Sequence, residues 1–146
     1  MKLPRAILIT VAAAFCLASC TATSPPQTTL YQALGGYDGI EAITDSFLGE
    51  LADNQQALPL FLNSDILRFR AQFIDHLCVT ADGPCSYDGD PMRETHRGMG
   101  ISTAQFNSIV ENLIAALEAN GVPTDTQNAL LQRLARHYSE IVERPS

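Results

Sequence analysis

The chain has 146 residues, of which 46% are hydrophobic, and its formal net charge at pH 7 is -7. This length is enough for one hydrophobic core and too short for two typical domains. The acidic balance leaves no basic patch for a nucleic acid, so we expect no nucleic-acid partner.

The first 19 residues predict an export signal rather than a folded element. Lys2 and Arg5 supply a basic start, and residues 6–17 form an apolar stretch that is too short to span a membrane. We therefore expect residues 1–19 to be a signal peptide. Their loss would make the remaining chain more acidic.

The end of this signal resembles a lipobox. Leu17-Ala18-Ser19-Cys20 is similar to the tetrapeptide of bacterial lipoproteins, in which the cysteine becomes the lipidated first residue of the mature chain. A plain cleavable signal with an incidental cysteine is the alternative. Since Thr21 rather than aspartate follows, the resemblance implies an exported, periplasm-facing lipoprotein that is anchored through Cys20 in the outer membrane. Residues 20–28, with their small polar residues and prolines, read as a flexible tether.

Residues 29–146 predict a single all-α domain. Apolar residues recur at helical spacing, and no alternating strand pattern occurs. Pro91 is expected at the first position of a short helix, Ser102 and Thr124 begin capping boxes that would open two further helices, and Asn120-Gly121 would end the first of these. The main apolar stripes are Ile40, Ile43, Phe47 and Leu51; Ile66, Phe69, Phe73 and Leu77; Phe106, Ile109, Val110, Leu113 and Leu117; and Leu130, Leu134, Tyr138 and Ile141.

The segment from Asp82 to His96 carries the strongest indication of chemistry. Two Gly-Pro-type breaks precede the short helix, on which Met92, His96 and Met99 are four and three residues apart. An imidazole framed by two thioethers suits an iron porphyrin. The alternative is an ordinary half-buried histidine that hydrogen-bonds to a carbonyl.

The whole domain resembles the group I truncated haemoglobins. The resemblance rests on Leu30-Tyr31-x-x-x-Gly35-Gly36, Phe47, Phe61, Gly83-Pro84-x-x-Tyr87-x-Gly89-x-x-Met92-x-x-x-His96-x-x-x-Gly100-Ile101, Phe106 and Gly121-Val122-Pro123. It implies a two-over-two helical sandwich around haem b. Since the sequence has no Cys-x-x-Cys-His motif, this haem would be held without covalent attachment. Asp82 stands where the family usually has a glycine, and Asp is among the residues that tolerate such backbone angles best.

The resemblance also assigns roles to residues. His96 matches the proximal histidine that binds iron, and Phe61 matches a phenylalanine that packs against the porphyrin. Leu48, Phe69 and Phe73 fall where many members have a tyrosine and glutamines beside the ligand. Met92, Ile101 and Phe106 complete the expected haem-binding set.

An apolar distal pocket has a functional consequence. A missing donor removes a hydrogen bond of about 1.5–3 kcal/mol and predicts an oxygen affinity roughly 10- to 100-fold lower. The affinities for carbon monoxide and nitric oxide, which depend less on such a donor, would fall less. A slip of one residue in the match would instead turn Gln72 toward the ligand.

Two histidines and two cysteines remain. His76 lies near the expected pocket, either as a polar residue at its rim, as a partner of the ligand or as a sixth iron ligand, whereas His137 is assigned no chemistry. Cys78 and Cys85 are expected to form a disulfide in an exported protein, which would stiffen the turn before His96. Two free thiols, or a zinc site with His76, are the alternatives.

The leading hypothesis is a membrane-anchored haem protein that reversibly binds a diatomic gas (oxygen, NO or CO). One alternative is a haem-dependent nitric oxide dioxygenase or redox enzyme, which needs an electron-transfer partner because the chain has no reductase domain. The other is an interaction lipoprotein that lacks haem. The sequence leaves open whether the protein is an enzyme.

Overall fold

The structure is a computed structural model that describes residues 28–143. The expected signal peptide, Cys20 and almost all of the tether lie outside the described residues. Within residues 28–143 every regular element is helical, and no helix there is long and apolar enough to cross a membrane. The elements are α1 (Leu30–Ala33), α2 (Gly36–Asp53), α3 (Leu58–Phe61), α4 (Ile66–Thr80), α5 (Met92–Thr95), α6 (Thr103–Ala119), α7 (Thr124–Leu134), the 3₁₀ helix η1 (Ala135–His137) and α8 (Tyr138–Ile141).

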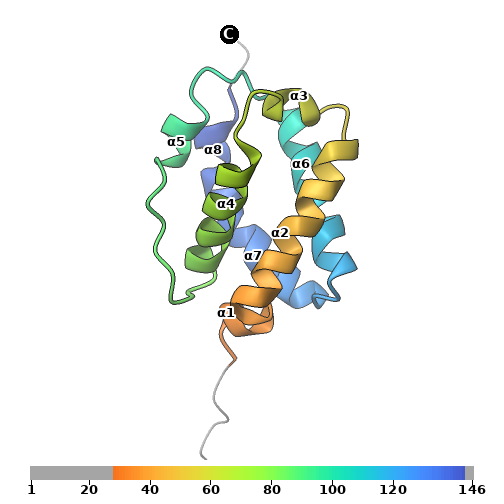
Figure 1. The fold of residues 1–146 in the computed structure, drawn as a ribbon, viewed down its shortest axis with the longest axis vertical. Coiled ribbons are helices and arrows are strands. Elements are labelled where there is room, and N and C mark those ends of the chain that lie inside the picture. The colour runs from red at the N-terminus through yellow and green to blue at the C-terminus, as the bar shows by residue number, and fades with distance from the viewer. Residues whose placement is uncertain (1–27, 144–146) are drawn as a thin grey trace, which may run out of the picture.

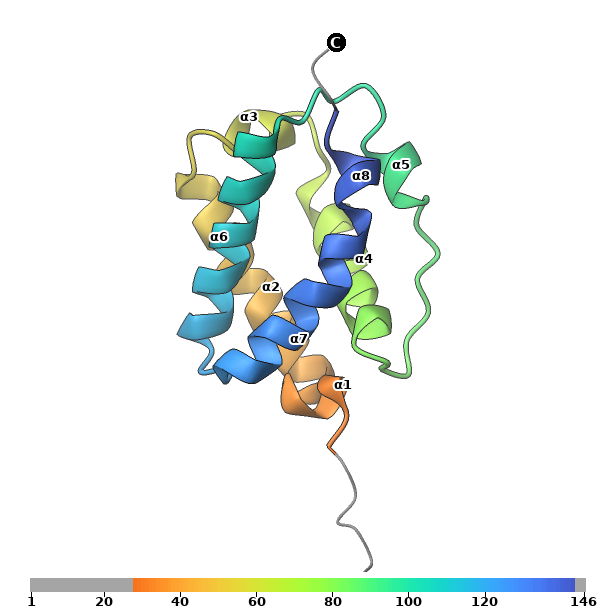
Figure 2. The ribbon, with the colours of Figure 1, turned by 180° about the vertical axis from the view of Figure 1, so that it is seen from behind.

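The long helices form two layers. Helices α2 and α4 make up one layer, and α6 with the α7–η1–α8 segment makes up the other (Figures 1 and 2). Helix α2 packs against both α6 and α4, so it joins the two layers. The short α5 stands outside α4, beside α8 (Figure 1). This arrangement confirms the expected two-over-two helical fold.

The apolar stripe of α2 forms the centre of the core. Ile40, Ile43 and Phe47 are at most 2% exposed, and they meet Ile74 and Leu77 of α4 and Leu117 of α6. Their spacing of three and four residues places them on one face of the helix. The hydrophobic effect thus fixes α2 between α4 and α6, and leaves the other side of α4 free to form part of a cavity wall.

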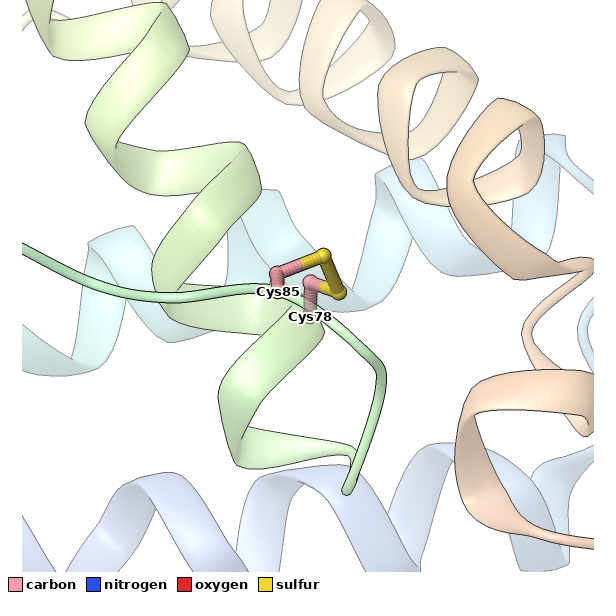
Figure 3. The surroundings of a disulfide bond; sticks show 2 residues. All are labelled: Cys78 and Cys85. Atoms are coloured by element: carbon pink, nitrogen blue, oxygen red, sulfur yellow. A yellow bond between two sulfur atoms is a disulfide. The ribbon is translucent and has the colours of Figure 1, made fainter.

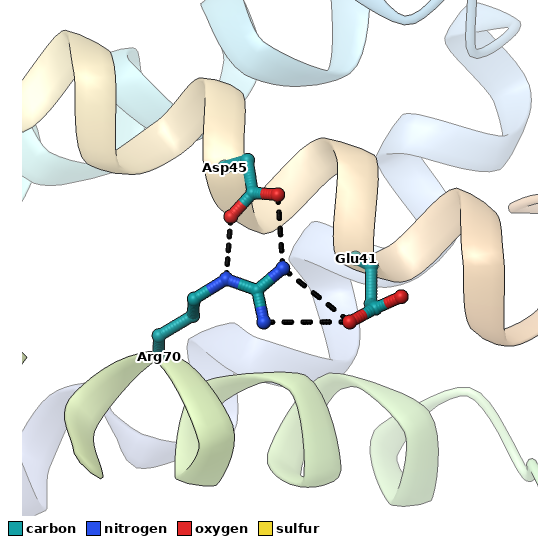
Figure 4. Close-up of polar contacts among 3 residues, drawn as sticks. All are labelled: Glu41, Asp45 and Arg70. Carbon is teal, nitrogen blue, oxygen red and sulfur yellow. Dashed lines mark hydrogen bonds and ion pairs between the residues drawn. The ribbon is translucent and has the colours of Figure 1, made fainter. Parts of the chain in front are cut away.

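An ion-pair cluster ties the surfaces of α2 and α4 together. The guanidinium of Arg70 on α4 donates to Asp45 through two nitrogens, at 2.5 and 2.9 Å, and to Glu41 through two more contacts at 3.3 Å (Figure 4). The hydrogen bond from Arg70 lowers the pKa of Asp45 below its ordinary 3.8. The paired geometry helps to set the angle at which α4 crosses α2.

The end of α4 is closed by a turn that the sequence only partly indicates. Asp82 adopts φ +60°, and the amide of Gly83 donates to the carbonyl of Cys78 at 2.8 Å. Asp82 therefore takes the left-handed angles that usually require glycine, and Arg133 holds its carboxylate at 2.7 Å. The chain then turns back along α4.

Cys78 and Cys85 form the expected disulfide across this turn (Figure 3). Cys78 is fully buried on α4, and Cys85 lies on the segment that follows the turn. The alternatives of two free thiols and a zinc site are excluded, because cysteines joined in a disulfide have no thiolate to offer a metal.

Some expected helix boundaries differ from the structure. Pro91 is the N-cap of α5 rather than its first residue, and α5 ends at Thr95, so His96 is its C-cap. The Ser102 capping box is present, but the Thr124 box is not, because the chain enters α7 one residue earlier with Pro123 as its cap. The last helix is also interrupted by η1.

Candidate functional site

A largely apolar cavity of about 290 Å³ has residues of α4 in its wall together with residues of α5, α6 and α8. This volume is close to the lower end of the range for small-molecule sites, roughly 300–1,000 Å³. All three histidines of the chain reach its wall. The lining residues are Phe47, Leu60, Phe61, Ser64, Phe69, Gln72, Phe73, His76, Tyr87, Met92, Thr95, His96, Met99, Ile101, Phe106, Ile109, Val110, Leu113, Leu134, His137 and Ile141.

His96 has the hydrogen bonding of a metal ligand. Its Nδ1 lies 2.7 Å from the carbonyl oxygen of Met92, one turn earlier in the chain. A carbonyl only accepts, so Nδ1 must carry the proton and donate it, which leaves the lone pair on Nε2. Metal-bound histidines are oriented in this way by a second partner. His96 is therefore ready to bind a metal from the cavity wall.

The donor set fits a porphyrin better than a bare ion. No group of three or more His, Cys, Asp or Glu side chains within residues 28–143 could hold a metal ion. A metal at His96 thus needs further ligands from a bound molecule. The apolar surroundings favour a large hydrophobic group such as haem, which brings four nitrogens of its own.

The α4 side of the cavity is built from aromatic rings. Phe61 meets the edge of Phe69 at 5.1 Å between ring centroids, Phe69 stacks on Phe73 at 5.5 Å, and Phe73 stacks on Phe47 at 4.9 Å. These contacts join α3, α4 and α2 into one continuous wall. Such a wall offers a flat ligand broad apolar contact.

His76 lies in the same wall but faces two other polar rings. Its ring centroid is 5.3 Å from that of Tyr87, which it meets edge to face, and 5.7 Å from that of His137. Burial lowers the pKa of His76 from 6.5 to about 4, and the charges of His137 and His96 add to this effect. The imidazole is therefore neutral at pH 7.

His137 enters the cavity from η1. Its Nδ1 is buried without a hydrogen bond, although Glu140 Oε1 lies 3.5 Å away, within reach for an ion pair. No role was expected for His137, yet Leu134, His137 and Ile141 are three and four residues apart and all line the cavity. Residues spaced three and four apart share one side of a helix, so this spacing indicated that His137 lies on the same side as Leu134 and Ile141.

The structure brings together most of the residues proposed from the sequence. Phe61, Phe69, Phe73, His76, Met92, His96, Ile101 and Phe106 all line the cavity, as does Met99. Thr95 and Tyr87, which the sequence placed in the same motif without a role, line it too.

Leu48 requires a correction. It is partly buried and packs against the core instead of lining the cavity, and Phe47 takes the place expected for it. Successive residues on a helix point about 100° apart, so only one of the two can face the cavity.

Gln72 also lines the cavity, and no other described residue hydrogen-bonds to its amide. Phe69 and Phe73 line the cavity as the unshifted match expected, and Gln72, which only the shifted match turned inward, lines it as well. The wall is therefore not wholly apolar, because Gln72 adds a neutral amide to it.

Comparison with known proteins identifies the fold family. The model of the bacterial-like globin family matches residues 29–142, which is most of the chain. The chain belongs to the bacterial-like globin family. Its relatives include the group 1 truncated hemoglobin of Tetrahymena pyriformis, which is 34% identical over 97 residues, with 66% of this globin and 79% of the relative covered.

Two further matches extend over more of the globin. A group 1 truncated hemoglobin of Nostoc sp., named GlbN, is 28% identical over 118 residues, which covers 81% of this chain and all of the relative. The crystal structure of the Fe(III) form of the Tetrahymena pyriformis protein superposes with a TM-score of 0.77 at 28% identity and covers 80% of this globin and 99% of that chain. These matches place the protein among truncated haemoglobins with the two-over-two fold.

Proposed function

We propose that this globin binds haem b in the cavity through His96 and reversibly binds a diatomic gas there. The observation that carries the proposal is His96 on an apolar cavity wall, with Nδ1 bonded to Met92 and Nε2 left free. Similarity to group 1 truncated hemoglobins supports it.

Each wall would make its own contribution to the site. His96 would hold the iron, while Met92, Ile101 and Phe106, which also line the cavity, would be apolar partners of the porphyrin. Phe61, Phe69 and Phe73 would cover the opposite face of the porphyrin and exclude water. When bound, haem supplies an iron with an open coordination position for a gas.

Gln72 would favour oxygen over carbon monoxide. A gas that accepts a hydrogen bond is stabilised by a nearby amide donor, and such bonds contribute about 0.5–1.5 kcal/mol when neutral. We therefore propose moderate oxygen affinity rather than the very weak binding of an apolar pocket. Electrons to keep the iron ferrous would come from an unidentified partner.

The test is an absorption spectrum of the haem-reconstituted globin in ferric, ferrous and carbon monoxide forms. We expect a ferrous spectrum that shifts with carbon monoxide and collapses in His96→Ala. His137→Ala is the matched control, since it removes another imidazole from the same cavity and should leave the iron ligand in place.

Two results would overturn parts of the proposal. A chain that takes up no haem would leave a haem-free interaction protein as the better explanation. A six-coordinate ferrous spectrum that becomes five-coordinate in His76→Ala would indicate a redox role, with His76 as a second iron ligand.

We also propose that the protein is exported and anchored through lipid on Cys20 to the outer membrane. The support is Leu17-Ala18-Ser19-Cys20 followed by Thr21. Since α1 lies at the end of the globin away from α3 and α5 (Figure 1), an anchor before it would leave the cavity side accessible. Labelling with a fatty-acid analogue should mark the native protein and not Cys20→Ser, and membrane fractionation would locate it.

A further inference from the structure

The segment between α4 and α5 runs back along α4 in an extended form. Residues 85, 87 and 89 are less exposed than residues 84, 86, 88 and 90, the alternation of an extended chain with one side against a neighbour. Within the described part of the molecule, the backbone of residues 84–89 makes no backbone hydrogen bond. Side chains must therefore hold this segment in place.

Two side chains fasten the segment to α4. Cys85 is bonded to Cys78, and two residues further on the ring of Tyr87 packs against His76, two residues earlier on α4. The segment and the helix thus pair in opposite directions, 85 with 78 and 87 with 76. We call these two contacts the clasp.

The clasp continues to the residue next to His96. The hydroxyl of Tyr87 donates to the carbonyl of Asp90 at 3.1 Å, and the hydroxyl of Thr95 donates to the same carbonyl at 3.1 Å. Gly89 lets the Tyr87 ring lie close to the backbone, because a Cβ there would be 2.4 Å from the ring. A chain of contacts therefore leads from the disulfide to α5.

We propose that the Cys78–Cys85 disulfide controls how firmly the His96 segment is held, so that its reduction releases haem. This inference rests on the proposed function. With the bond intact, residues 84–91 are fixed at two points on α4. Without it, only the aromatic contact of Tyr87 and a few side-chain hydrogen bonds hold them.

The chemistry requires an external dithiol as the reductant. Cys85 is partly exposed whereas Cys78 is fully buried, so a thiolate would attack the sulfur of Cys85 and expel the sulfur of Cys78 as a thiolate. The second thiol of the reductant then breaks the mixed disulfide. The protein gains two electrons and two protons as two thiols, and the reductant becomes a disulfide.

The test compares oxidised and dithiol-treated holoprotein in two measurements. Transfer of haem to an excess of an apoprotein acceptor gives the rate of haem loss. Hydrogen exchange of the apoprotein gives the opening of the α5 turn, where the amides of residues 94–97 donate to backbone carbonyls. We expect reduction to speed haem loss on the order of tenfold, because the tether limits the open conformations of the segment. Exchange of the amides of residues 94–97 should speed up while α6 stays protected.

Variants separate the clasp from other effects of the reductant. The double variant Cys78→Ala/Cys85→Ala should lose haem as fast as the dithiol-treated native protein does, whether or not dithiol is added. Cys20→Ser should respond to dithiol as the native chain does. Ser86→Ala is the matched control, since it alters an exposed neighbour of Cys85 in the same segment. It should behave as the native protein.

The outcomes distinguish the two proposals. Equal rates of haem loss and equal hydrogen exchange in both redox states would overturn the proposed control by the disulfide. If the segment opens on reduction but the chain never takes up haem, the disulfide does hold the segment and the proposed function is wrong.

Discussion

The two walls of the cavity are held in different ways. Helix α4 has 15 residues, a side-chain cap from Asp65, three fully buried core residues and the Arg70 cluster. The wall that carries His96 consists of a four-residue helix between two irregular segments. The comparison indicates that the long helix is the firmer wall and that the His96 wall takes its position from contacts with α4 through Cys85 and Tyr87 and with α8 through α5.

The largest effect should follow from removing a core side chain of helix α4, the more firmly held wall of the cavity. Leu77 on α4 is 1% exposed, so Leu77→Ala leaves a cavity and should cost about 2–5 kcal/mol of unfolding free energy. Leu67→Ala, on the same helix but 81% exposed, should change it by less than about 0.5 kcal/mol. Urea unfolding of both variants would check this, and equal costs would contradict the assigned core.

The junction of the two walls should be the next most sensitive point. A Cβ on Gly83 would lie 2.5 Å from the ring of Tyr31 and 2.6 Å from the sulfur of Cys78. Gly83→Ala should therefore cost about 1–3 kcal/mol, as overpacking does. Gly49→Ala on α2 has open space and should stabilise the helix by up to about 1 kcal/mol. Thermal unfolding should show shifts of opposite sign, and shifts of the same sign would refute the packing at Gly83.

The contact of His76 on α4 with Tyr87 should also make the stability of the protein depend on pH. Burial lowers the pKa of His76 from 6.5 to about 4, so between these values the unfolded chain binds a proton that the folded chain does not. Stability should therefore fall as pH drops through this window, by about 1–3 kcal/mol in total. His76→Phe apoprotein should show a flatter profile than the native apoprotein in urea unfolding from pH 7 to pH 4. An unchanged slope would mean that the ring is solvated.

Much of the fold could be predicted because the core of α2 and α6 follows simple helical periodicity. Ile40, Ile43 and Phe47 are buried as their spacing requires. The helix ends were harder, since Pro123 and Pro91 act as caps where side-chain patterns suggested other starts. Caps depend on backbone angles set by the neighbouring turn, which periodicity does not reveal.

The site was predicted less completely than the fold. The spacing of Met92 and His96 identified one wall, but a rotation of one residue on α2 decides between Leu48 and Phe47. The contact of His76 with His137 joins residues 61 positions apart, so no local pattern could indicate it. Such contacts follow from how α4 packs against the last helices.

The smallest effect should come from the ion pair of Arg70 with Asp45 on the surface of α4. The hydrogen bond from Arg70 lowers the pKa of Asp45, while its partial desolvation acts in the opposite direction. A carboxyl with a lowered folded pKa stabilises the protein above its unfolded value, and this stabilisation is lost as pH falls through the folded value. Arg70→Met should thus lower the melting temperature slightly at pH 7, and the difference from the native globin should shrink below pH 3.8. Added salt should also reduce this difference in melting temperature, because the cluster is exposed to solvent.

Arg68→Met is the control, since it removes an arginine of α4 that makes no ion pair within the described chain, and it should show no such pH dependence. Equal pH profiles for both variants would mean that the cluster does not couple α2 to α4.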